Sequence, residues 1–288
     1  MSKILYGKEV AALIEKELRD EVDELQNMGI CPTLAILRVG ETLGDIAYEK
    51  AAIKKADLLS VAVKKFTLPE DATEEEVISA VDNINRDCTI HGALILRPFP
   101  ESMNDERIRN RLVRGKDVDA ITDEALARVF SGKGRNYPCT ARACMEILKY
   151  NHIPIAGKVV LVIGRSLVIG KPMSMLLQKE NATVIMAHSR TSMEQMINLS
   201  ALADIVVVAT GKQDTFTSEL AHEGQTVLDV GMNRGSDGKL VGDVDFDGVS
   251  ELVEAITPVP GGVGSVTTAV LFKQLIESVR RIAGLDED

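Results

Sequence analysis

The sequence has little of what several functional classes need. It contains no tryptophan, and aromatic residues make up 3% of its 288 positions, so it offers few rings on which the bases of single-stranded nucleic acid could stack. Its formal net charge of −10 also argues against nucleic-acid binding. No apolar run approaches the roughly 20 residues that cross a membrane, and the first residues lack the profile of a signal peptide. We therefore expect a cytoplasmic protein that binds neither nucleic acid nor membrane.

Metal ligands are sparse as well. The four cysteines, Cys31, Cys88, Cys139 and Cys144, show no C-x-x-C spacing, and the four histidines are scattered along the chain. A zinc site needs its cysteines and histidines at short, regular spacings. We predict no bound metal.

Helical and strand patterns alternate in the first hundred residues. Runs with apolar residues at helical spacing are separated by short, continuous apolar runs that are typical of buried strands, and a Thr-Glu-Glu-Glu segment predicts a capping box. The predicted elements cover residues 7–29, 33–39, 44–59, 61–66, 73–86 and 92–96. This β-α-β rhythm predicts a parallel sheet.

A second series of this kind begins after Gly157. Its predicted strands cover residues 158–163, 183–186, 204–209 and 226–230, with a helix over 172–179. A last helix, over 266–283, is expected to pack back on the first domain. The fold class is therefore α/β with two domains: an N-terminal α/β domain of residues 1–145 plus 266–288, and a C-terminal, Rossmann-like dinucleotide-binding domain of residues 146–265.

The segment from Gly164 to Pro172 joins a predicted strand to a predicted helix. Dinucleotide-binding folds place their phosphate loop at this point, because glycines let the backbone approach the diphosphate and the helix N-terminus supplies N–H donors. The spacing is not G-x-G-x-x-G. An ordinary α/β turn is therefore the alternative interpretation.

The end of the next strand indicates which dinucleotide would bind. NAD-preferring sites usually carry Asp or Glu there, to bind the ribose 2′-hydroxyl, but this chain has His188-Ser189-Arg190. Arginine suits a 2′-phosphate, so we predict NADP, with NAD as the alternative cofactor and a solvated Arg190 as the alternative role. The predicted cofactor-binding residues are Gly164, Arg165, Ser166, Gly170, Pro172, Ser189, Arg190, Thr210, Gly211 and Gly231.

A set of ordered motifs resembles one family. The motifs are Lys116-Asp117-Val118-Asp119, Pro138-Cys139-Thr140, Gly164-Arg165-Ser166-x-x-x-Gly170-x-Pro172-Met173-Ser174, Asp229-Val230-Gly231-Met232-Asn233, Gly242-Asp243-Val244 and Thr257-Pro258-Val259-Pro260-Gly261-Gly262-Val263-Gly264. Together they resemble the bifunctional methylenetetrahydrofolate dehydrogenase/cyclohydrolase (FolD) family over essentially the whole chain.

The resemblance implies an enzyme of one-carbon metabolism, usually a homodimer, that binds folate between its two domains. Family members oxidise 5,10-methylenetetrahydrofolate with NADP or NAD, and many then hydrolyse the methenyl product to 10-formyltetrahydrofolate. Asp119 matches the pterin-binding aspartate and Tyr48 the tyrosine beside the p-aminobenzoyl ring. The family places the loop of Pro260, Gly261 and Gly262 near the nicotinamide and the folate.

The chain departs from the family at the residues that serve hydrolysis. The family helix reads Tyr-x-x-x-Lys, but the fourth residue after Tyr48 is Ala52, and Leu96 stands where the family has a glutamine. Hydride transfer needs positioning and no proton movement, whereas hydrolysis needs a proton donor and acceptor. We therefore expect a dehydrogenase with weak or absent cyclohydrolase activity. Lys55, seven residues after Tyr48 and on nearly the same helix face, is the candidate substitute acid/base.

Three alternatives stay open at this point. The first is a fully bifunctional enzyme in which a displaced group handles the proton. The second is a non-catalytic folate- or nucleotide-binding homologue. The third is a dehydrogenase for another substrate that shares the dinucleotide-binding domain.

Overall fold

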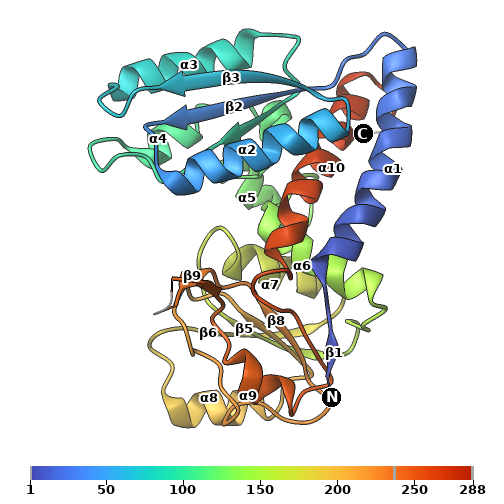
Figure 1. Cartoon of the computed structure of the whole chain (residues 1–288), viewed down its shortest axis with the longest axis vertical. Helices are drawn as coiled ribbons and strands as arrows, with labels where there is room; N and C mark the ends of the chain where they lie inside the picture. The colour runs from blue at the N-terminus through green and yellow to red at the C-terminus, as the bar shows by residue number, and fades with distance from the viewer. Residues whose placement is uncertain (1, 236–237, 287–288) are drawn as a thin grey trace. The chain divides into compact units, whose positions relative to one another are not determined.

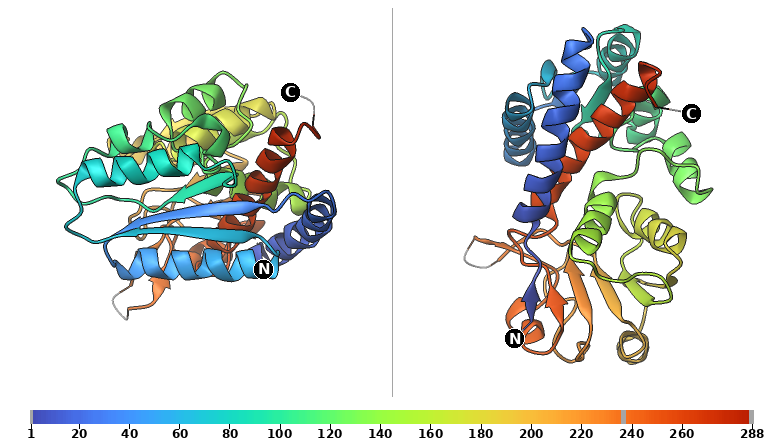
Figure 2. Two further views of the ribbon diagram at one scale, coloured as in Figure 1. Left: turned by 90° about the horizontal axis from the view of Figure 1, so that it is seen from above. Right: turned by 90° about the vertical axis from the view of Figure 1, so that its right-hand side faces the viewer.

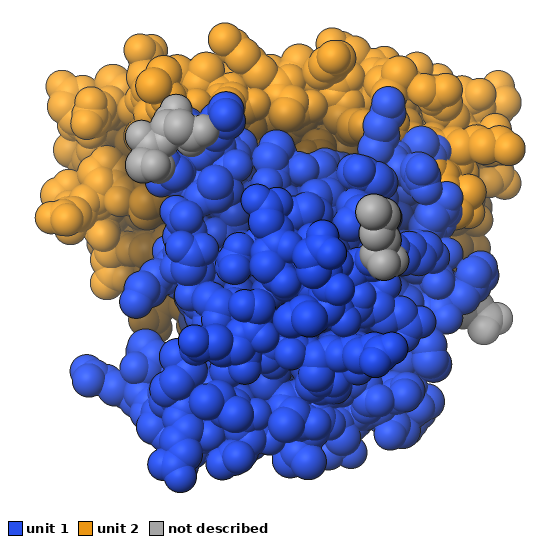
Figure 3. Space-filling model, turned by 60° about the horizontal axis from the view of Figure 1, so that its bottom comes forward, with its two compact units in different colours: residues 1–12, 138–267 blue, residues 13–137, 268–288 orange. Residues whose placement is uncertain are grey.

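The computed structural model describes residues 2–235 and 238–286. The chain divides into two compact units (Figure 3): unit 1 consists of Met1–Ala12 and Pro138–Thr267, and unit 2 of Leu13–Tyr137 and Thr268–Asp288. Most of the last helix, α10 (Gly264–Ile282), belongs to unit 2. The predicted two-domain α/β fold, with the final helix returning to the N-terminal domain, is therefore confirmed.

Unit 2 is built on a parallel three-stranded sheet in the order β3 (Ala62–Leu68), β2 (Thr33–Val39), β4 (Gly92–Ile95). Every residue of β2 is buried, because helices cover both faces of the sheet and leave an apolar run as its central strand. Figures 1 and 2 show α2 (Leu43–Leu58) along one face and α3 (Glu74–Arg86) along the other.

The rest of unit 2 is helical. Its part of α1 (Gly7–Asn27) lies beside its part of α10 (Figure 2), and Arg280 pairs with Glu24 at 2.9 Å. The connection from β4 to unit 1 contains three short helices: α4 (Asp105–Arg109), η1 (Arg114–Lys116) and α5 (Asp123–Phe130).

Unit 1 is built on a six-stranded sheet in the order β1-β11-β8-β7-β5-β6, and the paired strands are parallel. The strands are β1 (Lys3–Ile4), β5 (Val159–Ile163), β6 (Thr183–Ala187), β7 (Ile205–Val208), β8 (Thr226–Asp229) and β11 (Ala255–Ile256). The chain runs from β5 to β6 on one side, then crosses to β7 on the other. The strand order therefore reverses between β5 and β7, which is where ligands bind in open α/β sheets.

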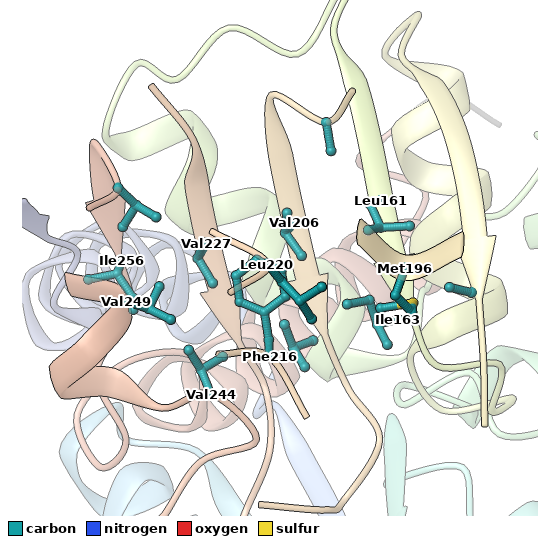
Figure 4. Close-up of a cluster of buried hydrophobic side chains, with 14 residues drawn as sticks. Leu161, Ile163, Met196, Val206, Phe216, Leu220, Val227, Val244, Val249 and Ile256 are labelled. Atoms are coloured by element: carbon teal, nitrogen blue, oxygen red, sulfur yellow. The ribbon is translucent and has the colours of Figure 1, made fainter. Parts of the chain in front are cut away.

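Helices and a small hairpin complete unit 1. The helices are α6 (Cys139–Tyr150), α7 (Gly170–Lys179), α8 (Met193–Ser200) and α9 (Phe246–Ser250), and the hairpin pairs β9 (Asn233–Arg234) with β10 (Leu240–Val241). Figure 4 shows side chains of the core on one side of the sheet, with Phe216 and Leu220 packed against Val206 and Val227. Across both described segments of the chain, no helix combines the length and apolar character needed to cross a membrane.

Candidate active site

The loop after β5 depends on two glycines that touch each other. Gly164 has a φ of +136°, and a Cβ there would collide with the carbonyl group of Ala209. A Cβ at Gly170, the first residue of α7, would overlap the carbonyl group of Gly164. The Ser166 hydroxyl accepts a hydrogen bond from the backbone N–H of Ile169 at 3.2 Å. The glycine spacing noted in the sequence is thus set by direct backbone contact.

This loop lies at the reversal point of the sheet. Because Gly164 packs on Ala209, the loops that follow β5 and β7 meet at the carboxyl end of the strands. The N-terminus of α7 opens at the same place and offers backbone N–H donors and positive potential to an anion. The arrangement fits the diphosphate of a dinucleotide.

The turn after β6 carries the residues that the sequence predicts to distinguish NADP from NAD. His188 accepts a hydrogen bond from Thr191 N–H at 2.8 Å on its carbonyl, and its ring nitrogen accepts one from Arg190 N–H at 3.2 Å. The side chains of Ser189 and Arg190 are exposed, as is Arg165 in the first loop. These three side chains are therefore open to a ligand, as their predicted role requires.

The loop after β7 is held by a buried carboxylate, that of Asp243. This side chain accepts hydrogen bonds from the backbone N–H groups of Thr210 at 2.5 Å and Gly211 at 2.9 Å. Asn233 donates to its other oxygen at 2.8 Å. Asp243 therefore fixes the two residues that the sequence predicts as cofactor contacts on this loop.

A second buried carboxylate, that of Asp229, holds the loop after β8. It accepts hydrogen bonds from Gly231 N–H and Asp243 N–H, each at 2.9 Å, and from Val244 N–H at 3.1 Å. Burial raises the pKa of Asp229 to about 6, although the three N–H donors act in the opposite direction. A Cβ at Gly242 would collide with this carboxylate, which explains why a glycine precedes Asp243.

The glycine-rich loop before α10 completes this edge of unit 1. The buried Thr257 hydroxyl accepts a hydrogen bond from Asp229 N–H at 2.8 Å, and Gly7 donates its N–H to the Gly261 carbonyl at 2.8 Å. A Cβ at Gly262 would collide with the carbonyl of Pro258. The loop is therefore built from close backbone contacts, with Pro260 exposed.

In unit 2, hydrogen bonds to the residues that precede Asp119 hold the turn that carries it. The buried Lys116 ammonium donates to the carbonyl groups of Ile84, Asn85 and Asp87 at 2.6–2.9 Å, at the end of α3. Gln274 of α10 donates to the Val118 carbonyl at 2.8 Å. Asp119 is half-buried and directly follows Val118, so these bonds fix the backbone that leads into it.

The folate residues predicted in unit 2 share one edge of its sheet. Asp117 forms a parallel bridge with Ala93 of β4, so Asp119 runs alongside the end of β4, where Leu96 follows. Tyr48 lies in the second turn of α2, which starts just after the carboxyl end of β2. Ala52 is fully buried, Leu96 is buried and Tyr48 is half-buried.

A buried ionic network next to Tyr48 escaped the sequence interpretation. Glu49 is 4% exposed and accepts Arg38 Nε at 2.5 Å and Lys65 Nζ at 2.5 Å, while Arg38 also donates to the Gly40 carbonyl. Burial acts to raise the pKa of Glu49, but the hydrogen bonds from Lys65 and Arg38 outweigh it and hold that pKa below its usual value. The network ties α2 to β2 and β3.

Lys55, the candidate substitute for the family lysine, and Arg97, the cation that follows Leu96, both have carboxylate partners. Lys55 pairs with Glu15 of α1, and Arg97 pairs with Asp105 through two of its nitrogen atoms. These ion pairs count against either side chain serving as a free acid/base.

The glycine loop at the reversal point of a parallel sheet places the chain among two-domain, dinucleotide-binding α/β proteins. The sequence matches the model of the tetrahydrofolate dehydrogenase/cyclohydrolase catalytic domain over residues 5–119, and the model of that family's NAD(P)-binding domain over residues 138–283. The chain therefore belongs to the tetrahydrofolate dehydrogenase/cyclohydrolase family.

Individual relatives agree with this assignment. The chain is 44% identical to a protein of Clostridium botulinum named bifunctional protein FolD, over 98% of this chain and 99% of that one. The FolD crystal structure from Campylobacter jejuni is 32% identical and superposes with a TM-score of 0.94, over 98% of this chain and 100% of that chain. The FolD of Trypanosoma brucei, crystallised with NADP and an inhibitor, is 30% identical with a TM-score of 0.93, over 98% of each chain. Since relatives are named bifunctional, they favour retention of both activities over the predicted loss of cyclohydrolase.

Proposed function

We propose that the chain oxidises 5,10-methylenetetrahydrofolate to the methenyl form and transfers the hydride to NADP. The observation that carries this proposal is the contact between Gly164 and Gly170, which builds a dinucleotide loop at the reversal point of the sheet in a member of this family. NADP, when bound, supplies the ring that accepts the hydride.

The residues of unit 1 then have separate binding roles. Arg165, Ser189 and Arg190 would hold the 2′-phosphate, and the N-terminus of α7 the diphosphate. Asp243 would keep Thr210 and Gly211 in place beneath the cofactor. The NADP found in the Trypanosoma brucei relative supports the choice of NADP over NAD.

The residues of unit 2 would position the folate. Asp119 can accept hydrogen bonds from pterin N–H groups, while Tyr48 and Leu96 line the ring system. The Pro260, Gly261 and Gly262 loop of unit 1 would allow close approach to the flat rings. Loss of hydride from the methylene carbon leaves a resonance-stabilised cation and moves no proton, so alignment is the main requirement.

Isotope transfer tests this reaction directly. We expect purified enzyme, given substrate deuterated on the methylene carbon and NADP, to produce NADPH that carries one deuterium, as measured by mass spectrometry. Label in water, or no NADP-dependent product, would exclude hydride transfer. A protein that binds folate and NADP without turnover would be the non-catalytic homologue.

We infer hydrolysis of the methenyl product as a second activity, because the relatives named bifunctional span nearly the whole chain. Ala52 cannot move a proton, and the Lys55 ammonium pairs with Glu15. Among the residues predicted to bind folate, Asp119 carries a carboxylate, which can accept a proton. We assign it the proton of the attacking water.

The decay of methenyltetrahydrofolate above its spontaneous rate measures this activity. At saturating methenyltetrahydrofolate, which offsets the lost pterin contact, Asp119→Asn should lower kcat about 10²-fold or more, whereas Lys55→Met should leave it within about twofold, since general acid–base groups contribute 10²–10⁴-fold. Decay at the spontaneous rate in the wild type would restore the expectation of a dehydrogenase without cyclohydrolase. Loss of hydrolysis in Lys55→Met would instead identify Lys55 as the substitute. The homodimer implied by the family remains a prediction, and sedimentation velocity would test it.

A further inference from the structure

A cavity of about 260 Å³ lies in unit 1 at the amino ends of the parallel strands. Its walls include the first residues of β1, β7, β8 and β11 and the segment 151–154 after α6. The chain begins at this edge of the sheet (Figure 1), whereas the loops assigned to the cofactor follow the carboxyl ends of the strands. Because β5, β7 and β8 have four or five residues, roughly 13–17 Å separates the two edges. The cavity is therefore distinct from the proposed cofactor site.

Four residues of the cavity wall form one row across the sheet. They are successive partners on β1, β11, β8 and β7, namely Lys3, Ala255, Thr226 and Ile205. Paired residues on neighbouring strands project from the same face of a sheet, so these four side chains share the face that the cavity lies on. Ala255 and Ile205 are buried. The row therefore combines apolar contact surface with an ammonium group and a hydroxyl.

The hydroxyl of Thr226 is available to a ligand. Thr226 is 6% exposed, and its hydroxyl makes no hydrogen bond to any residue that the structure describes. Every fully enclosed side-chain nitrogen or oxygen atom of a buried residue in the described segments has a hydrogen-bond partner, so this hydroxyl is not enclosed by protein and reaches the cavity that Thr226 lines. A ligand can therefore bond it without breaking an internal hydrogen bond.

The charged side chains of the wall balance one another. Lys158 and Asp204 pair at 2.8 Å. The side chains of Lys3 and Glu254, by contrast, pair neither with each other nor with any other described residue. With His152 counted as neutral, the wall has no net charge, and one group of each sign remains for a ligand. A ligand of a single sign would be repelled by one of these two groups.

We propose that this cavity binds a small zwitterion, an α-amino acid with an apolar side chain. Lys3 and the Thr226 hydroxyl would receive its carboxylate, and Glu254 its ammonium group. The apolar side chain would lie on Ile205 and Ala255. The volume corresponds to about nine water molecules at roughly 30 Å³ each, which suits a ligand of this size.

Calorimetric titration of the full chain tests the proposal with three probes that share one apolar body. The probes are L-valine, isovalerate, which lacks the ammonium group, and isobutylamine, which lacks the carboxylate. We expect L-valine to bind and each analogue to bind at least about tenfold more weakly. Lys3→Gln and Thr226→Val should each weaken L-valine about tenfold and leave isobutylamine unchanged. Glu254→Gln should weaken L-valine to the same extent and leave isovalerate unchanged.

Two control variants remove the same charges elsewhere in unit 1. Lys8→Gln and Glu251→Gln change exposed residues outside the cavity wall and should leave L-valine binding unchanged. Thr226→Val should keep the wild-type Tm, because the lost hydroxyl bonds no described residue. The proposal is overturned if L-valine does not bind at millimolar concentration, if either analogue binds as tightly, or if a control weakens binding as much as the wall variants. None of these readouts needs cofactor, folate or catalytic activity.

Discussion

Asp243 donates its backbone N–H to the side chain of Asp229 at 2.9 Å, and both carboxylates are buried. The Asp243 carboxylate holds the loop after β7, and the Asp229 carboxylate holds the loop after β8. The hydrogen bond between the two residues joins these loops. Two sequence motifs that are far apart along the chain are therefore parts of one scaffold beneath the proposed cofactor site.

The first prediction concerns this scaffold. Asp243→Ala should weaken NADP binding by about tenfold or more and lower the free energy of unfolding by about 1–3 kcal/mol, because Thr210 and Gly211 lose the acceptor of their N–H groups. Fluorescence titration and urea unfolding measure the two effects. Asp247→Ala, at an exposed position of α9, should change neither. Unaltered NADP binding in Asp243→Ala would show that the loop does not need the carboxylate.

The second prediction is a dependence of stability on pH. The pKa of Asp229 is about 6 in the folded chain and near 3.8 when unfolded, so its stabilising contribution is complete below the unfolded value and is lost as the pH rises through 6. The wild type should therefore lose up to about 3 kcal/mol relative to Asp229→Asn between about pH 4 and pH 7. Urea unfolding of both proteins across this range provides the measurement. The raised pKa of Asp229 would be contradicted if the difference in unfolding free energy between the two proteins stayed constant, or grew in favour of the wild type, as the pH rose.

The third prediction concerns cofactor choice. Arg190→Gln should raise the KM for NADP about tenfold and leave the KM for NAD within about twofold, because the lost guanidinium faces a group that NAD lacks. Initial rates with each cofactor measure this. Arg234→Gln removes an equal charge from an exposed position of β9 and should alter neither KM. Equal effects on both cofactors would mean that Arg190 does not recognise the 2′-phosphate.

The fourth prediction concerns the network beside Tyr48. Glu49→Gln should cost about 3 kcal/mol of unfolding free energy at neutral pH, because it leaves the guanidinium of Arg38 buried without a carboxylate. Since the folded pKa of Glu49 is lowered, the wild-type advantage should be present above the unfolded value and shrink as the pH falls below it. Chemical denaturation at neutral and acidic pH tests both statements.

The matched control for this network is Lys65→Gln. The Lys65 side chain is 50% exposed, so its loss should cost about 1 kcal/mol or less. If Glu49→Gln proved as mild as Lys65→Gln, the buried pair would not be what ties α2 to the sheet.

Features that depend on local patterns could be predicted from the sequence. The apolar runs of β2 and β5 gave strands whose bounds match the predictions to within one residue, and Thr73 and Glu76 form the expected capping box. By contrast, β1 covers two residues and has no periodicity to detect. Because β1 pairs with β11, residues 1–12 belong to unit 1.

The chemistry of the site was less accessible from the sequence, because it depends on contacts between distant residues. The pairing of Lys55 with Glu15 spans 40 positions, and no local pattern reveals it. Asp229 and Asp243 did leave a signal, since Asp243 directly follows Gly242 and Asp229 lies two residues before Gly231, and neither glycine could carry a side chain. A buried acid within two residues of such a glycine is typical of a carboxylate that binds backbone N–H groups.

A paired assay on one purified preparation tests the central claim most directly. One arm follows oxidation of 5,10-methylenetetrahydrofolate with NADP and with NAD, and the other follows decay of the methenyl form above its spontaneous rate. We predict oxidation that is faster with NADP than with NAD, together with enzymatic decay of the methenyl form. Absence of NADP-dependent oxidation in a folded preparation would contradict the proposed dehydrogenase.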